Sequence, residues 1–373
     1  MQFRDLKEQY KVLKVEIDAG IQEVIDSCGF ILGKKVVELE EKLAAYVGRK
    51  YCVCVGNGTD ALQLSLMAYD IGQGDAVFTS DFTYFASAGC ASIIGATPVL
   101  VDIKLDTFNI DPEAFEEAVK RTISEGRLTP KAVIPVDLFG QPAEMDRIIA
   151  IAKKYNMIVL EDAAQGFGGN INGKRACSFG DISTTSFFPA KPLGCYGDGG
   201  AIFTDDEKIA ERLKSLRVAG KSPNDKYDNR EIGMNSRLDT IQAAILLPKL
   251  KAFEEYELDA VNLVAKWYSE RLTGKFVIPS VLDGYLSSWA QYTVLCKNTE
   301  QRDALQKKLK ENDIPTMVYY PRGLHQQQAY SWMKLDDSLF PNTIEATRRV
   351  LSLPMHPYMD EKTVEKITSL MLE

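Results

Sequence analysis

Lys191 stands in a setting that could make its amine reactive. It lies in the stretch SFFPAKPLGC, with Pro189 and Pro192 on either side and Phe187 and Phe188 before them. Because proline breaks helices, we expect a stiff and largely apolar turn rather than a solvated helix face. An ammonium group in such a turn is poorly hydrated, so its pKa should fall and the neutral amine should become available for a Schiff base. The competing interpretation is a solvated surface charge, the usual state of lysine.

A second candidate, Asp162, follows a predicted buried strand. The apolar run at 157–160 is typical of a parallel strand, and Asp162 comes at its carboxyl end, the edge at which open α/β sheets bind ligands. The carboxylate could cap the next helix, a common role at such a junction. Alternatively, it could pair with the cationic ring nitrogen of pyridoxal phosphate, which needs such a partner to act as an electron sink.

The third candidate is the turn GNGT, which lies between a predicted strand at 51–55 and a predicted helix from Asp60. Uncovered backbone amides and a helix amino terminus can together hold a phosphate. The turn also matches a dinucleotide fingerprint, G-x-G-x-x-A, through Gly56, Gly58 and Ala61. This NAD-binding interpretation is the weaker one, because over forty residues precede the motif and no strand ending in a clear ribose-binding acid follows it.

Taken together, the three segments resemble the DegT/StrS family of nucleotide-sugar aminotransferases, which are fold-type I pyridoxal phosphate enzymes. Further similar segments at 30–48, 95–103, 139–146 and 235–246 extend the resemblance over nearly the whole chain. Within the family, the segment around Lys191 most resembles enzymes that aminate UDP-2-acetamido-2-deoxy-3-oxo-glucuronate for surface polysaccharide such as O-antigen.

The resemblance implies a role for each residue of a cofactor site. Lys191 would form the internal aldimine and carry the proton between the amino donor and the cofactor, while Asp162 would keep the pyridine nitrogen protonated. Gln165 would hydrogen-bond the ring hydroxyl. The remaining cofactor contacts would be Gly58, Thr59 and Ser186 around the phosphate and Tyr84 over the ring. For Tyr84 the alternative is a core residue on a helix face.

Asn235 follows a polar stretch at 219–233 that predicts a long exposed loop. In the family, an asparagine at this position crosses the dimer interface to the partner's cofactor phosphate, which implies a homodimer with shared active sites. The alternative is a helix N-cap at Asn235, with the helix starting at 237.

Two departures from the family pattern concern the substrate. Where many relatives have R-x-H-G, this chain has Arg217 followed by Val-Ala-Gly, and where relatives often have H-Y-P it has Tyr-Tyr-Pro at 319–321. The cofactor chemistry is unaffected, but the identity of the sugar is left open. The candidates for holding a diphosphate or a carboxylate are Arg217, Arg237, Tyr319, Tyr320, Arg322 and His325. An arginine in such a loop is about as often a solvated charge.

Composition restricts the class of protein. The 373 residues suffice for two domains, and 45% hydrophobic and 26% charged residues are ordinary for a soluble globular protein. A net charge of −8 argues against nucleic acid and anionic membranes as partners and requires local cations for an anionic substrate. No segment is apolar enough for a signal peptide or a membrane span, so we expect a cytoplasmic protein. Its seven cysteines are expected as core thiols, and with only two histidines we expect no metal site.

The order of predicted elements indicates an α/β fold. From about 51 to 204, strands alternate with helices, which requires a mostly parallel sheet covered by helices on both faces. The resemblance implies seven strands in this sheet. We expect an N-terminal segment and a large cofactor-binding domain over 1–250 and a smaller α/β domain over 251–373. The outer predicted elements are helices at 11–27, 34–47, 236–272 and 297–312 and strands at 289–296 and 314–320.

The sequence therefore predicts a homodimeric pyridoxal phosphate-dependent aminotransferase that passes the amino group of L-glutamate to a UDP-linked 3-keto N-acetylhexosaminuronate. The glutamate donor comes from the resemblance alone. The alternatives are an aminotransferase for a 4-keto-6-deoxy sugar carried by dTDP or UDP, an NAD-dependent nucleotide-sugar dehydrogenase or epimerase, and a non-catalytic regulator of the same fold. Sugar dehydratases of this fold have histidine in place of the lysine, so the presence of Lys191 argues against them.

Overall fold

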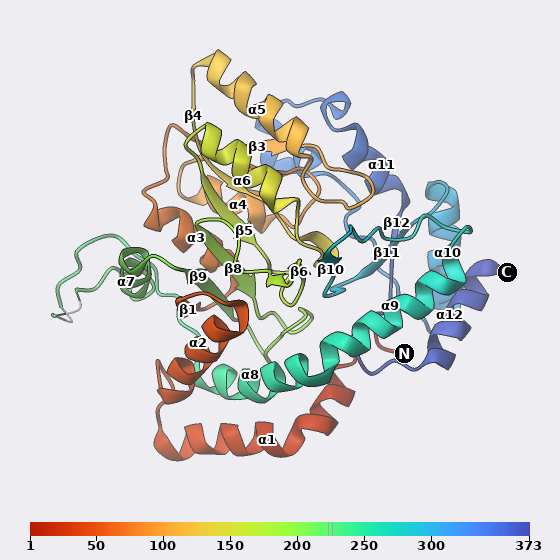
Figure 1. The fold of residues 1–373 in the computed structure, drawn as a ribbon, viewed down its shortest axis with the longest axis horizontal. Helices are drawn as coiled ribbons and strands as arrows, with labels where there is room; N and C mark the ends of the chain where they lie inside the picture. The colour runs from red at the N-terminus through yellow and green to blue at the C-terminus, as the bar shows by residue number, and fades with distance from the viewer. Residues whose placement is uncertain (223, 226) are drawn as a thin grey trace.

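A seven-stranded sheet in the order β1-β9-β8-β5-β4-β2-β3 runs through the centre of the computed structural model, which describes residues 1–373 except 223 and 226 (Figure 1). Strand β9 is antiparallel to both of its neighbours, and the other neighbouring strands are parallel. The predicted mostly parallel, seven-stranded sheet is therefore confirmed. The strands are β1 Tyr51–Val55, β2 Asp75–Ser80, β3 Thr97–Val101, β4 Thr129–Ile134, β5 Ile158–Asp162, β8 Ile182–Ser186 and β9 Gly200–Thr204.

Helices cover both faces of this sheet, because successive strand residues point to opposite sides and both sides are apolar. On one face, Val53 and Val55 pack with helices α3 (Gly58–Ala68), α4 (Ala86–Ile93) and α7 (Glu207–Leu216). On the other face, Cys52 and Cys54 belong to a core cluster with α2 and α8. Strand β4 alternates in the same way and places Val133 against α5 and α6. The helices of this second face are α2 Lys34–Val47, α5 Pro112–Glu125, α6 Met145–Lys154 and α8 Thr240–Ala252.

The two N-terminal helices agree with the sequence. Helix α2 has the predicted bounds, whereas α1 (Leu6–Ser27) starts earlier than expected. Its earlier start has a local cause, since the Asp5 carboxylate caps the helix by accepting a hydrogen bond from the Glu8 amide at 3.0 Å. The predicted exposed loop at 219–233 is also confirmed for the residues that the structure describes, and Tyr227 and Ile232 there are 83% and 88% exposed.

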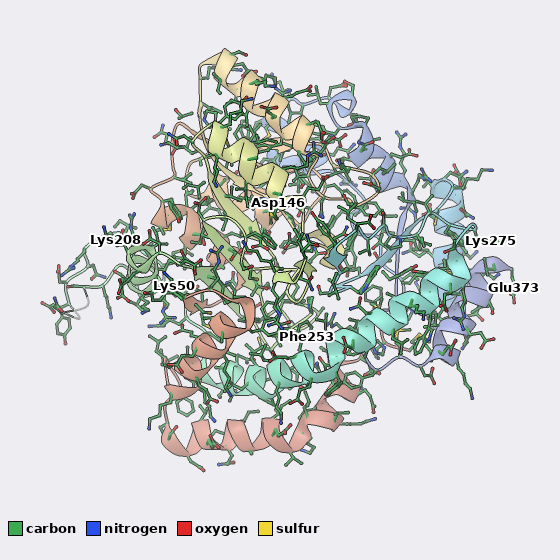
Figure 2. All side chains as sticks on the ribbon, viewed as in Figure 1. Lys50, Asp146, Lys208, Phe253, Lys275 and Glu373 are labelled. Carbon is green, nitrogen blue, oxygen red and sulfur yellow. The ribbon has the colours of Figure 1, made fainter. Side chains whose placement is uncertain are left out.

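A nearly continuous helix connects the sheet to the C-terminal part of the chain. Helix α8 passes through a π-helical turn (Phe253–Glu257) into α9 (Leu258–Leu272), and the Phe253 ring lies 5.8 Å from that of Phe167 (Figures 1 and 2). The predicted domain division between residues 250 and 251 falls inside α8 and stays a prediction.

The C-terminal part has its own core around an antiparallel pair of strands, β11 (Tyr292–Leu295) and β12 (Val350–Leu353). The strand predicted at 314–320 is wrong. Only Met317 bridges to Ser352, because the rings of Tyr319 and Tyr320 draw the segment toward Phe3 and Phe82 instead of along a neighbouring strand. The other elements here are α10 Thr299–Glu311, α11 Pro341–Arg349, α12 Glu361–Leu372 and the 3-10 helices Leu324–Gln326, Gln328–Met333 and Asp337–Leu339.

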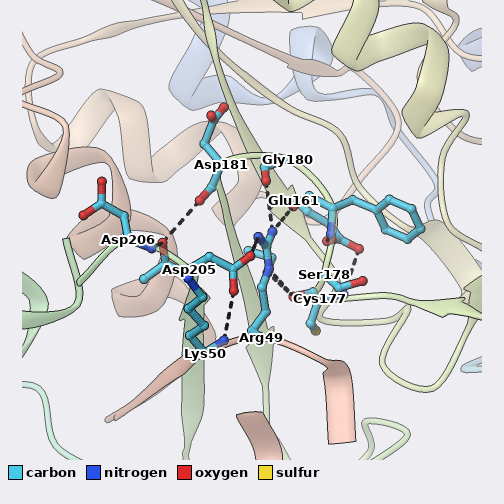
Figure 3. Close-up of polar contacts among 12 residues, drawn as sticks. Arg49, Lys50, Glu161, Cys177, Ser178, Gly180, Asp181, Asp205 and Asp206 are labelled. Atoms are coloured by element: carbon cyan, nitrogen blue, oxygen red, sulfur yellow. Dashed lines mark hydrogen bonds and ion pairs between the residues drawn. The ribbon is translucent and has the colours of Figure 1, made fainter. Parts of the chain in front are cut away.

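Arg49 holds together several connections at the end of the sheet opposite to the carboxyl end of β5. Its guanidinium donates to the carbonyls of Cys177, Phe179 and Gly180 and pairs with Asp205 at 2.8 Å (Figure 3). The amides of Cys177 and Phe179 in turn donate to the buried Glu161 carboxylate, each at 2.9 Å. Glu161 lies on β5 and immediately precedes Asp162, so this network helps to fix the position of β5.

The prediction of core thiols is confirmed for all of the cysteines but one. Six cysteines are buried and Cys28 is exposed. Among the residues that the structure describes, no cluster of ligands could hold a metal ion. None of the described helices has both the length and the apolar character needed to cross a membrane.

Candidate active site

The predicted cofactor residues converge at one edge of the sheet. Asp162 ends β5, Ser186 ends β8, and Gly58 opens α3 just after β1. Because these three strands run in the same direction, their carboxyl ends lie on the same edge, where open α/β sheets bind ligands. Lys191 lies in the turn that follows β8, and its amide donates to the Phe188 carbonyl at 2.9 Å.

The turn before α3 forms a cradle in which the backbone is uncovered. Asn57 caps the helix, its side-chain oxygen accepting from the Asp60 amide at 2.8 Å. A Cβ added to Gly58 would lie 2.7 Å from the Cβ of Ser186, so the Gly58 backbone and the Ser186 hydroxyl are immediate neighbours. With Thr59 next in the chain, free amides and hydroxyls meet at the positive end of the helix, an arrangement that fits a phosphate group.

Replacing Gly58 by alanine should weaken cofactor binding by about ten-fold or more, because the new methyl group must displace Ser186 from the phosphate cradle. Fluorescence titration of the apoprotein with pyridoxal phosphate measures the effect. The matched control is Gly72→Ala, where the nearest atom to an added Cβ lies 3.6 Å away. Equal affinity of the Gly58 variant and the control would show that the cradle does not hold the phosphate.

Asp162 is a buried carboxylate with specific partners. Its Oδ2 accepts from the Ser87 hydroxyl at 2.8 Å and its Oδ1 accepts from the Ala164 amide at 3.2 Å. Burial raises the pKa of Asp162, while these hydrogen bonds and the charge of Lys191 oppose the rise. Turns rather than a helix follow Asp162, so the helix-cap alternative is wrong. Ser87 lies on α4 and was not foreseen; its only sequence signal is its place in the segment after β2.

Burial and charge act on Lys191 as its sequence setting suggests. Burial lowers the pKa of Lys191, the carboxylate of Asp162 opposes this, and the nearby Arg4 guanidinium adds to the lowering. The effects of Lys191 and Asp162 on each other place the two groups within electrostatic reach. The arrangement combines an amine that is easily made neutral with a carboxylate that can hold a cation.

Gln165 and two tyrosines line the same region. The Gln165 side-chain oxygen accepts from the Phe139 amide at 2.9 Å, and its nitrogen donates to the Tyr320 hydroxyl at 3.2 Å. Tyr320 is thus brought to the cofactor residues rather than to the outer surface. Tyr84 is 58% exposed just before α4, so the alternative of a core residue is wrong for it.

Two of the candidate substrate residues are committed to other contacts. Arg217 is buried and donates to Glu40 at 2.5 Å and to the Cys54 carbonyl at 2.8 Å. His325 is buried between Asp81 (Nδ1 to Oδ2, 2.6 Å) and Asp337 (Nε2 to Oδ1, 2.9 Å). These contacts occupy much of the hydrogen-bonding capacity of the two side chains, and their part in binding a diphosphate or carboxylate stays a prediction.

The contacts of His325 with Asp81 and Asp337 join two segments of the site, and we call these three residues the His325 clasp. The amides of His325 and Leu324 also donate to Asp81, which directly follows β2 and precedes the segment carrying Tyr84. Burial tends to lower the pKa of His325, but the two aspartates outweigh it and the net shift is upward. The clasp therefore joins the segment at 319–325 to the end of β2.

The other candidates stay open. Arg237 is half-buried and has no ion pair among the described residues, while Arg322 is exposed. Tyr319 is half-buried, with its ring edge-on to Phe3 at 6.3 Å. Asn235 is exposed, and α8 starts only at Thr240 with Asp239 before it, so the N-cap alternative for Asn235 is wrong.

The residues present fit pyridoxal phosphate. A helix amino terminus with uncovered amides suits the phosphate, the buried Asp162 suits a cationic ring nitrogen, and Gln165 offers an amide beside it. Lys191 supplies an amine whose pKa burial lowers, as covalent attachment to a carbonyl group requires.

Comparisons with known proteins agree with this geometry. The model of the DegT/DnrJ/EryC1/StrS aminotransferase family matches residues 11–372. The UDP-2-acetamido-2-deoxy-3-oxo-D-glucuronate aminotransferase of Pseudomonas aeruginosa is 46% identical over 370 residues, with 98% of each chain covered. The dTDP-3-amino-3,6-dideoxy-alpha-D-galactopyranose transaminase of Aneurinibacillus thermoaerophilus is 42% identical over 367 residues, covering 98% of this chain and 97% of that protein. A crystal structure of a DegT/DnrJ/EryC1/StrS aminotransferase from Brucella abortus superposes with a TM-score of 0.96 at 44% identity, covering 100% of this chain and 98% of that one.

These matches confirm the predicted family, fold type and class of enzyme, and pyridoxal phosphate is the cofactor of the family. They give no support to the NAD-dependent alternative for the GNGT turn. This chain therefore belongs to the DegT/DnrJ/EryC1/StrS aminotransferase family, as its sequence predicts.

Proposed function

We propose that the chain transfers the amino group of L-glutamate to the 3-keto carbon of a UDP-linked N-acetylhexosaminuronate, and that the product enters a surface polysaccharide such as O-antigen. The observation that carries the aminotransferase chemistry is the position of the buried Asp162 at the end of β5 and of Lys191 in the turn after the neighbouring β8, at the same edge of the sheet. The support for this sugar is the similarity to the Pseudomonas aeruginosa enzyme that its name assigns to a UDP-3-oxo-glucuronate.

Each residue of the site has a defined task in this reaction. Pyridoxal phosphate, when bound, supplies the electron sink. Asp162, which accepts hydrogen bonds from Ser87 and Ala164, would stabilise the positive charge of the protonated ring nitrogen. Lys191 removes and returns a proton, and burial favours this role because it lowers the pKa of the amine. The cradle of Gly58 and Ser186 orients the phosphate and fixes the ring relative to these groups.

The acceptor carries several negative charges, so local cations must hold it against a net charge of −8. Arg237 and Arg322 remain candidates, since neither forms an ion pair with a described residue. Tyr319, half-buried in the segment before the His325 clasp, could add a hydrogen bond from its hydroxyl.

A panel of acceptors tests the proposal. The purified holoenzyme is incubated with glutamate and, separately, with a UDP-3-keto uronate, the matching UDP-3-keto sugar without the carboxylate, and dTDP- and UDP-4-keto-6-deoxy sugars, and products are identified by mass. We expect preferential amination of the uronate, with 2-oxoglutarate formed in equal amount. Amination of a 4-keto-6-deoxy sugar would favour the alternative acceptor. A protein with the visible cofactor band that aminates none of the acceptors would leave the non-catalytic regulator as the better explanation.

We also propose that the enzyme is a homodimer and that Asn235 serves the partner's site. If Lys191→Ala and Asn235→Ala chains are unfolded together and refolded, heterodimers should regain up to about half of the wild-type activity per dimer, because one of the two sites then carries no defect. Two individually weak parents would give an active mixture. Mass analysis of the refolded dimers verifies that heterodimers form.

A contact within the chain makes this experiment informative. The hydroxyl of Ser236, the residue after Asn235, accepts a hydrogen bond from the Gly56 amide of its own chain at 2.9 Å, close to the phosphate cradle. If proven heterodimers are no more active than the average of their parents, Asn235 acts in the site of its own chain. The contact of the adjacent Ser236 with Gly56 would then hold Asn235 near that site.

A further inference from the structure

Three ionisable side chains that the proposed chemistry does not use lie beside the turn carrying Lys191. They are Arg4, which precedes α1, Lys249 on α8, and Glu257 in the π-helical turn. Lys249 is 1% exposed and Glu257 is 2% exposed. Buried charges are costly, and they persist in a fold only where they are paired and hydrogen-bonded.

Both cations bind backbone oxygens of the segment that follows Lys191. The Arg4 guanidinium donates from Nη2 to the Pro192 carbonyl at 3.0 Å. The Lys249 ammonium donates to the Gly194 carbonyl and lies 4.8 Å from the centroid of the Tyr196 ring. Hydrogen bonds from charged donors are about twice as strong as neutral ones, so two such bonds on alternate residues hold this segment firmly.

Glu257 is a buried carboxylate whose negative charge acts on both cations. Its carboxylate accepts from the Gln9 side chain at 2.8 Å and from the Tyr358 hydroxyl at 2.6 Å, so it is held from α1 and from the C-terminal part. Burial lowers the pKa of Arg4 to about 10 and that of Lys249 to about 8, and in both cases the negative charge of Glu257 opposes the fall.

The group also connects the turn to the rest of the site. Phe3, the neighbour of Arg4, accepts a hydrogen bond from the Met355 amide at 3.1 Å, and its ring meets that of Tyr319 edge-on. Through its contact with the carbonyl of Pro192, the residue after Lys191, Arg4 places a positive charge near the Lys191 amine, and this charge lowers the pKa of Lys191. A purely structural role would account for the hydrogen bonds to the carbonyls, but it would give Arg4 no influence on the protonation of Lys191.

We propose that Arg4 is a positioning residue for Lys191: together with Lys249 it fixes the turn through the carbonyls of Pro192 and Gly194, and its positive charge favours the neutral form of the Lys191 amine. Glu257 keeps both cations in place. This inference rests on the proposed function, in which Lys191 is the reactive amine.

Two substitutions of Arg4 separate its charge from its hydrogen bond. In the holoenzyme of Arg4→Met, the midpoint of the pH titration of the visible cofactor band should rise by about half a pH unit to one pH unit, because a positive charge that disfavours protonation has gone. Its kcat should fall by about ten-fold, with the KM for glutamate changed by less than about two-fold. Arg4→Lys keeps the charge but is shorter, so it should keep the wild-type midpoint and still lower kcat.

The matched control is Arg349→Met. Arg349 also donates to a backbone carbonyl, that of Cys296 at 2.6 Å, but in the C-terminal part and outside this group of charges. The control should leave the midpoint unchanged even if it lowers the melting temperature. If Arg4→Met loads cofactor too weakly to be titrated, Arg4→Gln, which also lacks the charge but can still donate a hydrogen bond, replaces it and should show the same rise of the midpoint.

The outcomes distinguish this inference from the proposed function. An unchanged midpoint and kcat in Arg4→Met, with a wild-type enzyme that shows the visible band and borohydride labelling on Lys191, would overturn the role of Arg4 and leave the function intact. An equal rise of the midpoint in the Arg349 control would also overturn it. A wild-type kcat in Arg4→Lys would remove the part played by the Pro192 contact. A wild-type protein without the band would instead overturn the proposed function.

Discussion

Replacing Lys191 by alanine is expected to abolish transamination while leaving the fold intact. The substitution removes the amine that attaches the cofactor and the group that carries the proton, and proton transfer alone typically contributes about a hundred- to ten-thousand-fold. Steady-state assay with glutamate measures the loss, and circular dichroism verifies the fold. The matched control is Lys208→Ala, an exposed lysine on α7, which should keep full activity.

Chemical labelling of the wild-type protein gives an independent measure of the same assignment. Reduction of the holoenzyme with borohydride should fix the cofactor covalently to the peptide that contains Lys191. Peptide mapping by mass spectrometry locates the label. Labelling of Lys249, the other buried lysine near this turn, would contradict the assignment.

Replacing Asp162 by asparagine is expected to lower kcat by about a hundred-fold or more while cofactor binding persists. The amide keeps the size of the side chain and can still meet Ser87, but it no longer stabilises a positive charge on the ring nitrogen. The loss should appear in kcat rather than in KM, because the interaction strengthens as negative charge develops on the reacting carbon.

Ser87→Ala is the companion variant for Asp162. It removes one hydrogen bond to the carboxylate but keeps the charge, so we expect a loss of only about ten-fold. A turnover number for Asp162→Asn close to that of the wild type, or no worse than that of Ser87→Ala, would show that the carboxylate does not act on the cofactor.

Local signals in the sequence were sufficient for the fold and for the cofactor side of the site. The apolar strands are short and separated by glycine and proline, so their alternation with helices predicts a sheet covered on both faces. Asp162 ends strand β5, while Gly58 and Lys191 lie in the turns after β1 and β8, and these positions place them at one edge without knowledge of any long-range contact.

Long-range partners explain what the sequence could not predict. Ser87 meets Asp162 from a position 75 residues away, and His325 meets Asp81 from 244 residues away. Nothing near Arg217 indicates that its guanidinium is bound to Glu40. At 314–320 the aromatic pattern is typical of a strand, but contacts of Tyr320 with Phe82 across the molecule prevailed over that local preference.

The separation between strand ends and loops in this site bears on how such a chain can change its substrate. Gly58, Asp162 and Ser186 are fixed by the central sheet, whereas Arg237 and Tyr319 lie in irregular segments that no strand constrains. Loop residues can be exchanged at little cost to stability, while substitutions at the sheet edge disturb the core. Evolution, or a protein engineer, can therefore retune which sugar is accepted by altering loops alone, and the amino-transfer machinery is inherited unchanged.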